Sequence, residues 1–110
     1  MRPEHVELLR RLALNDQGAA EETLGAILAN PDESVVDAKS HALVRVAALI
    51  AGESALPSYL WAVESALAAG ASEDEIVDVL AAIAPIVGSA RLTSAAPHLA
   101  LALGYDIEAT

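Results

Sequence analysis

The chain has 110 residues, 55% of them hydrophobic, and this length suits one domain with a single core. Its 16 acidic and 6 basic residues give a formal charge of −10, which repels nucleic-acid phosphates and anionic lipid surfaces, so neither partner is expected. Because the chain contains no cysteine, disulfides, thiolate metal sites and thiol redox chemistry are excluded for this chain.

Apolar residues recur at helical spacing, and no segment alternates apolar and polar residues as a half-buried strand does. We therefore expect an all-α bundle of about six helices, continuous as one domain over residues 1–110. The first helix follows Pro3, and its apolar stripe comprises Val6, Leu9 and either Leu12 or Ala13. The residues that are expected to end it are Asn15, Asp16 and Gly18.

The next two helices are predicted from their caps and stop signals. The second covers residues 19–28 and is stopped by the Asn-Pro pair at 30–31. The third begins with Ser34 or Asp37 as its N-cap and runs to Ala51. Because this third helix is apolar almost all round, we expect it at the buried centre of the fold.

The fourth helix is predicted to begin near Pro57, a favourable first-turn residue, and to end at Gly70, which can adopt the left-handed terminating conformation. Its expected core stripe consists of Leu60, Val63 and Leu67. The capping box of the fifth helix follows closely, at residues 72–75, and is the clearest helix boundary in the sequence.

The last third of the chain contains two residues that interrupt helices. Pro85 removes a hydrogen-bond donor and Gly88 loosens the backbone, so a kink or a break is expected at one of them. A sixth helix then reaches Gly104, and the tail after Tyr105 is expected to be dispensable. These interruptions also argue against a membrane span in this apolar region.

Three segments, residues 37–50, 61–76 and 79–90, together resemble the carboxymuconolactone decarboxylase and alkyl hydroperoxidase D family. The resemblance lies in the order of a buried helix, a helix ending in Ala-Ala-Gly, and a capped helix beginning Ser-Glu-Asp-Glu-Ile. It covers roughly the last two thirds of the chain and implies an oligomeric helical fold, most often a trimer or a hexamer made of two trimers.

The resemblance also indicates where the family's reactive groups stand. In the peroxidase branch two cysteines and a histidine lie on the fourth helix, and a glutamate lies on the helix before it. The corresponding positions in this chain are Ala55, Ser58, Ala62 and Ala42. Since none of these residues can form a disulfide, the family's peroxide reduction is excluded. The histidine of the decarboxylase branch is likewise replaced by Ala62.

Arg45 lies one turn after His41 on the third helix, so the two can share a helix face. There Arg45 can hold a substrate carboxylate while His41 acts as the catalytic proton-transfer residue. The alternative is structural: Arg45 pairs with Glu64 or with an acid of another subunit, and His41 is a surface residue.

Ser58, Tyr59 and Trp61 stand where the resemblance places reactive groups, and they are candidates to line a pocket for an unsaturated ligand, with Ser58 as a second catalytic candidate. Alternatively, Tyr59 and Trp61 anchor a subunit interface and Ser58 bonds to the backbone of the first turn.

Arg91 and His98 complete the substrate-binding candidates, although a lone histidine in an apolar helix is often a hydrogen-bonded structural residue. The three histidines are scattered and give no zinc-binding spacing, and the acidic run at residues 73–78 lacks the ligand pattern of a calcium loop. No glycine-rich phosphate loop is present, so we expect no metal and no cofactor.

These observations leave two functions open. One is a cofactor-independent, decarboxylase-like enzyme acting by proton transfer on a small organic acid or lactone. The other is a non-catalytic binding or assembly protein on the same scaffold. In both, the apolar excess predicts a homo-oligomer whose contacts involve residues 83–92 and the helix carrying Trp61. Without an uninterrupted apolar N-terminal stretch, the default location is the cytoplasm.

Overall fold

The computed structural model describes residues 1–29 and 34–108, except for the side chains of residues 26–29. In this part of the chain the structure is all-helical, as predicted, with six helices and no strand. The chain divides into two compact units, Met1–Val35 and Val36–Thr110, which are described separately. None of the described helices is long and apolar enough to cross a membrane.

The first unit contains α1 (Pro3–Ala13) and α2 (Gln17–Ala29). The turn between them is held by Asp16, whose carboxylate accepts a hydrogen bond from the Ala19 amide at 3.2 Å and pairs with Arg11 at 3.0 Å. Arg11 also reaches Glu22 on α2 at 3.2 Å. Asp16 therefore begins α2, so the prediction that Gly18 helps to end the first helix was wrong, since Gly18 lies inside α2. The predicted stop at Asn30 and Pro31 lies outside the described residues.

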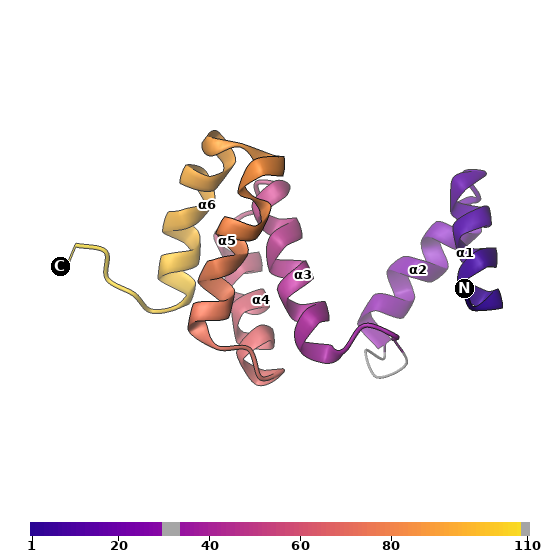
Figure 1. The fold of residues 1–110 in the computed structure, drawn as a ribbon, viewed down its shortest axis with the longest axis horizontal. Helices are drawn as coiled ribbons and strands as arrows, with labels where there is room; N and C mark the ends of the chain where they lie inside the picture. The colour runs from indigo at the N-terminus through magenta and orange to yellow at the C-terminus, as the bar shows by residue number, and fades with distance from the viewer. Residues whose placement is uncertain (30–33, 109–110) are drawn as a thin grey trace. The chain divides into compact units, whose positions relative to one another are not determined.

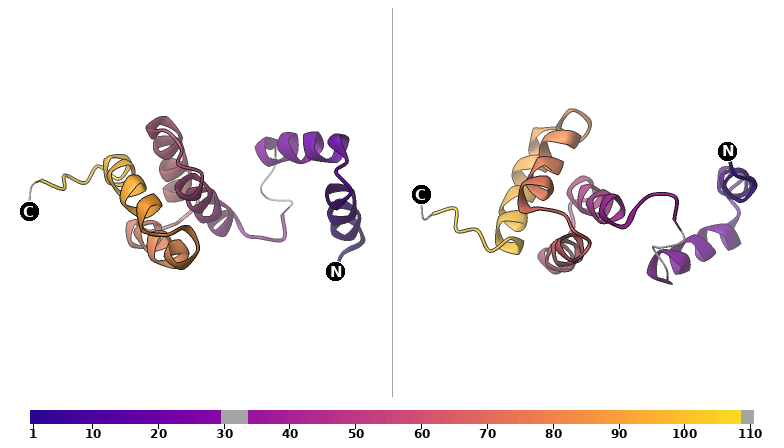
Figure 2. Two further views of the ribbon diagram at one scale, coloured as in Figure 1. Left: turned by 90° about the horizontal axis from the view of Figure 1, so that it is seen from above. Right: turned by 60° about the horizontal axis from the view of Figure 1, so that its bottom comes forward.

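The second unit is a bundle of α3 (Ala38–Ala51), α4 (Leu56–Ala68), α5 (Glu73–Val87) and α6 (Ser89–Ala102). The chain runs up α3, down α4, up α5 and down α6, as Figure 1 shows. Each helix packs mainly on two others, α3 on α4 and α5, and α6 on the same two helices. The views of Figure 2 show how directly α6 turns back along α5.

Local signals set the helix boundaries of this bundle. Asp37 is the N-cap of α3, because its carboxylate accepts the Ser40 amide at 2.8 Å. The predicted capping box of α5 is confirmed: the Ser72 hydroxyl accepts the Glu75 amide at 3.0 Å, and the Glu75 carboxylate accepts the Ser72 amide at 2.9 Å. The break between α5 and α6 falls at Gly88, whose φ of 83° is a conformation that favours glycine.

The core is made of apolar residues from all four helices, and among the described residues no polar or charged residue is classed as buried. Its most deeply buried side chains are Val46, Ile50, Tyr59, Val63, Ala66, Ile76 and Leu99. The predicted core stripe of the fourth helix was wrong in two of its three members, because Leu60 is 47% exposed and Leu67 is 42% exposed. Instead α4 buries the face that carries its small residues Ala62 and Ala66, beside Tyr59 and Val63.

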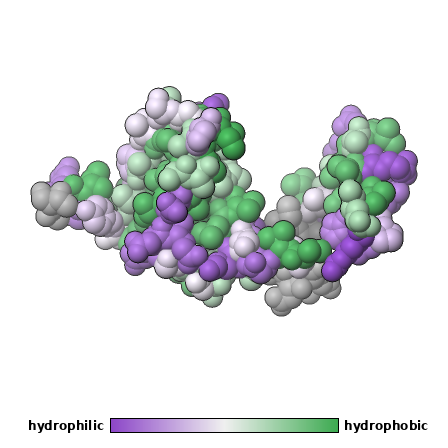
Figure 3. All heavy atoms as spheres, in the orientation of Figure 1, coloured by the Kyte–Doolittle hydropathy of each residue, from purple (hydrophilic) through white to green (hydrophobic). Residues whose placement is uncertain are grey.

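The third helix was expected at the buried centre of the fold, but only one of its faces is buried. Its residues Ala42, Val46 and Ile50 face the core, whereas Val44 is 62% exposed. Figure 3 shows apolar residues spread over the visible surface of the bundle and hydrophilic ones gathered over the beginning of α5. One side of an almost wholly apolar helix thus stays uncovered in the single chain.

An ion pair joins the start of α3 to the start of α5: Lys39 Nζ lies 2.9 Å from a Glu75 carboxylate oxygen. The hydrogen bond from the Ser72 amide, followed by the one from Lys39, lowers the pKa of Glu75 below its ordinary value of 4.5. A carboxyl group with a lowered pKa in the folded state stabilises the fold above its unfolded pKa, and this contribution is lost as the pH falls through the folded pKa.

We therefore predict that Glu75→Gln makes the free energy of unfolding less dependent on pH below about pH 5, the range in which a shifted carboxyl group loses its contribution. Glutamine can still complete the capping box, so the change isolates the charge. The measurement is urea unfolding at a series of acid pH values. Asp78→Asn, at an exposed position on the same helix, is the control and should preserve the wild-type slope. Equal slopes for both variants and the wild type would contradict the prediction.

Candidate functional site

His41 and Arg45 are positioned by the N-cap of α3. Because Asp37 begins this helix, and its carbonyl accepts the His41 amide at 2.9 Å, His41 falls at the end of the first turn and Arg45 one turn later. Both residues are half-buried. Residues at this spacing lie on one helix face, with Cβ atoms about 5–6 Å apart.

The structure brings Trp61 of α4 to this face. The Arg45 guanidinium carbon lies 5.8 Å from the centre of the Trp61 ring, within the range of a cation–π interaction. Trp61 is 53% exposed, so its indole also borders solvent. Arg45 and Trp61 thus connect α3 and α4, and together with His41 they form what we call the α3–α4 face.

Tyr59 and His98 form a second group of predicted site residues, inside the bundle. The rings of Tyr59 on α4 and His98 on α6 meet edge to face, with centres 5.4 Å apart and planes at 77°. Tyr59 is only 1% exposed, and its burial raises the pKa of the phenol above its ordinary value of 10.0. This burial excludes the interpretation of Tyr59 as an exposed interface anchor, since the ring already belongs to the core.

His98 carries an unusual polar atom for an apolar interior. Its Nδ1 is buried and has no hydrogen-bond partner among the described residues. An unsatisfied buried nitrogen costs about 1–3 kcal/mol. The interpretation of His98 as a hydrogen-bonded structural residue is therefore wrong for Nδ1, and the ring stabilises the bundle through its contact with Tyr59.

The two remaining candidates are exposed. Ser58 is in the first turn of α4, where its amide donates to the Ala55 carbonyl at 3.1 Å. It lies three residues before Trp61, a spacing that puts the two residues on neighbouring positions of the helix surface. Arg91 lies on α6 and donates from Nη1 to the Val87 carbonyl at 3.4 Å.

The positions indicated by the family resemblance also separate in the structure. Ala42 and Ala62 are 6% and 1% exposed and belong to the core, whereas Ala55 and Ser58 are exposed at the start of α4. Ala55 is the N-cap of this helix but makes no side-chain capping bond. The buried part of this region is therefore lined by apolar groups that cannot exchange a proton.

A surface hollow that the sequence did not predict lies between α5 and α6. It has a volume of about 380 Å³ and is bordered by Glu73 and Tyr105, among others. Glu73 was interpreted only as part of an acidic first turn, and Tyr105 only as the start of a tail.

Among the described residues, no cluster of three or more histidine and carboxylate side chains could hold a metal ion.

Comparisons with protein-family models, with curated proteins and with solved structures find no match for this chain.

Proposed function

We propose that this chain binds a small organic acid at the α3–α4 face and exchanges a proton with it through His41, on a scaffold similar to that of the carboxymuconolactone decarboxylase family. The observation that carries the proposal is the placement of the Arg45 guanidinium over the Trp61 ring, one turn from His41. It brings a cation, an aromatic surface and an imidazole together on neighbouring helices.

Each of the three side chains supplies a different part of this chemistry. A cation–π contact requires only that the guanidinium lie over the ring, whereas a bidentate bond to a carboxylate uses its N–H groups, so the two interactions are compatible. The indole offers a flat apolar surface to an unsaturated acid or a lactone. Imidazole is the side chain that most often exchanges protons near neutral pH, which suits His41 to general acid–base catalysis.

For a β-keto acid the proposed step balances without a cofactor. The bond between the α-carbon and the carboxylate breaks, carbon dioxide leaves, and the electron pair forms an enolate on the ketone oxygen. The protonated His41 donates a hydrogen bond to that oxygen while its negative charge develops, which lowers the barrier to bond breaking. His41 then gives its proton to the α-carbon and regains one from water. The proposed step uses none of the other candidates, Ser58, Arg91 and His98.

Trp61 is the only tryptophan of the chain, so its fluorescence reports binding directly. We predict that acetoacetate and benzoate change Trp61 emission in a saturable way. Arg45→Met should lower the affinity for both acids by about tenfold or more, because a hydrogen bond to a charged group contributes about 1.5–3 kcal/mol. His41→Ala should leave benzoate binding within about twofold but abolish acetoacetate decarboxylation.

Arg91→Met is the matched control, since it removes the same charge from an exposed position on α6. An emission change that does not saturate would contradict the proposed binding site. So would an equal loss of affinity for the two acids in Arg45→Met and Arg91→Met. Saturable binding without turnover by the wild type would leave the binding site but remove the catalytic role.

A second candidate function, a non-catalytic assembly protein on the same scaffold, is favoured by a different observation. Alanines occupy the buried positions 42 and 62, while apolar side chains lie exposed on α4 and at the end of α5. Ile86 is 84% exposed, close to the break at Gly88, and Leu60 is 47% exposed. Such exposed residues are typical of subunit contacts, and a trimer or a hexamer would cover them.

We predict from this second candidate that light scattering at micromolar concentration gives the mass of a trimer or a hexamer. Ile86→Asp should lower that mass, because a carboxylate buried at a contact without a partner is strongly unfavourable. In the isolated subunit the same change is harmless, since residue 86 is exposed. Ile107→Asp, 58% exposed after the end of α6, is the control and should keep the wild-type mass. A monomeric wild type would refute the assembly.

A further inference from the structure

The hollow between α5 and α6 is separate from the α3–α4 face and shares no residue with it. It has a volume of about 380 Å³, within the range of about 300–1,000 Å³ that small-molecule sites occupy. We call it the α5–α6 hollow, and the residues that line it are Glu73, Asp74, Val77, Leu80, Ala96, Leu99, Ala100, Leu103 and Tyr105.

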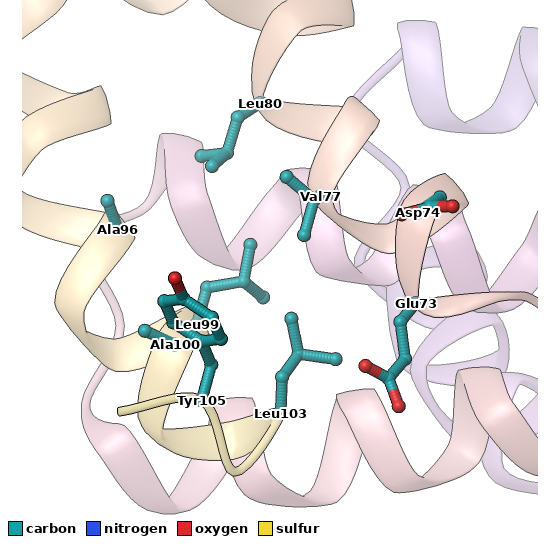
Figure 4. A pocket seen from close by; sticks show the side chains of 9 residues that line it. All are labelled: Glu73, Asp74, Val77, Leu80, Ala96, Leu99, Ala100, Leu103 and Tyr105. Carbon is teal, nitrogen blue, oxygen red and sulfur yellow. The ribbon is translucent and has the colours of Figure 1, made fainter. Parts of the chain in front are cut away.

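The wall of the α5–α6 hollow is apolar. In Figure 4 the side chains of Val77, Leu99 and Leu103 converge on a common space, and the ring of Tyr105 lies beside Leu99 and Ala100. Leu99 is fixed in the core at 2% exposure, so the floor is rigid, whereas Val77 is 48% exposed and forms part of the rim. Such a surface favours the hydrocarbon part of a ligand.

The polar end of the α5–α6 hollow is negative. Figure 4 shows the Glu73 carboxylate at its edge, on the side of Leu103, while the Asp74 carboxylate is directed away. Glu75 is engaged by Lys39 at 2.9 Å, but Glu73 has no ion-pair partner among the described residues. The positive end of the α5 dipole, about half a unit charge, is outweighed by the three carboxylates of its first turn.

We propose that the α5–α6 hollow binds a small amphiphilic ammonium compound, with an aryl or alkyl body against Val77, Leu99 and Leu103 and its cationic group beside Glu73. Charge complementarity selects this class. A carboxylate of the same shape would meet Glu73 and a chain with a formal charge of −10, and a neutral analogue would leave Glu73 without a partner. The Tyr105 ring adds a flat surface that also attracts cations.

The test compares three ligands with nearly the same hydrocarbon part: 2-phenylethylammonium, 2-phenylethanol and 3-phenylpropionate. Amide chemical shifts of the ¹⁵N-labelled full chain are followed during titration. The ammonium compound should give saturable shifts at Val77, Leu99 and Tyr105, and the carboxylate should bind at least about fivefold more weakly.

Two variants separate charge from shape. Glu73→Gln should weaken binding of the ammonium compound about three- to fivefold, as expected for the loss of one exposed ion pair. The affinity for the alcohol should not change. Ala96→Leu, at an exposed lining position on α6, should fill the hollow and weaken all three ligands without unfolding the bundle. Asp78→Asn, which lies outside the hollow, is the control for charge and should change nothing.

Three results would overturn the proposal. They are the absence of saturation up to about 10 mM ammonium compound, equal affinity for the ammonium and carboxylate ligands, and shifts that are insensitive to Ala96→Leu. Because Arg45 and Trp61 play no part in this hollow, failure here leaves the function proposed for the α3–α4 face untouched.

Discussion

The packing of α4 against α3 and α6 is the constraint on which the rest of the bundle depends. The buried faces of α3 and α4 carry small residues, Ala42 on α3 and Ala62 and Ala66 on α4, all at most 6% exposed. Because an alanine leaves room for a neighbouring helix, these faces can pack closely around the buried ring of Tyr59. Leu60 and Leu67 of α4 lie on its exposed side.

This constraint also determines where chemistry is possible. An apolar core has no place for a charged group, so the cations of the bundle lie toward its surface, where Lys39 pairs with Glu75 and Arg45 lies over the Trp61 ring. His98 is the exception, since its Nδ1 is buried while the ring packs on Tyr59.

The parts of the fold that depend on adjacent residues could be predicted from the sequence. The capping box at Ser72 and the cap at Asp37 are examples, because each is formed within four residues of chain. The buried face of α4 could not be predicted, since both of its faces are apolar and the choice depends on shape rather than hydrophobicity. Leu60 and Leu67 were assigned to the core for that reason.

The candidate site was predictable only in part. That His41 and Arg45 share a face follows from helical spacing, whereas the contact between Arg45 and Trp61 depends on how α3 crosses α4. The contact between Tyr59 and His98 joins α4 to α6, and Glu73 and Tyr105, which border one hollow, are 32 residues apart in the sequence. Tertiary packing, which no local sequence pattern encodes, determines both of these contacts and the hollow.

The most direct measurement of the central claim is the free energy of unfolding of Ala66→Leu, determined with urea. Ala66 is 0% exposed, so the larger side chain must force the surrounding core residues apart and should lower the free energy of unfolding by about 1–3 kcal/mol. Ala68→Leu, at an exposed position on the same helix, should stay within about 0.5 kcal/mol of the wild type. An Ala66→Leu variant as stable as the wild type would contradict the close packing of α4 in the bundle.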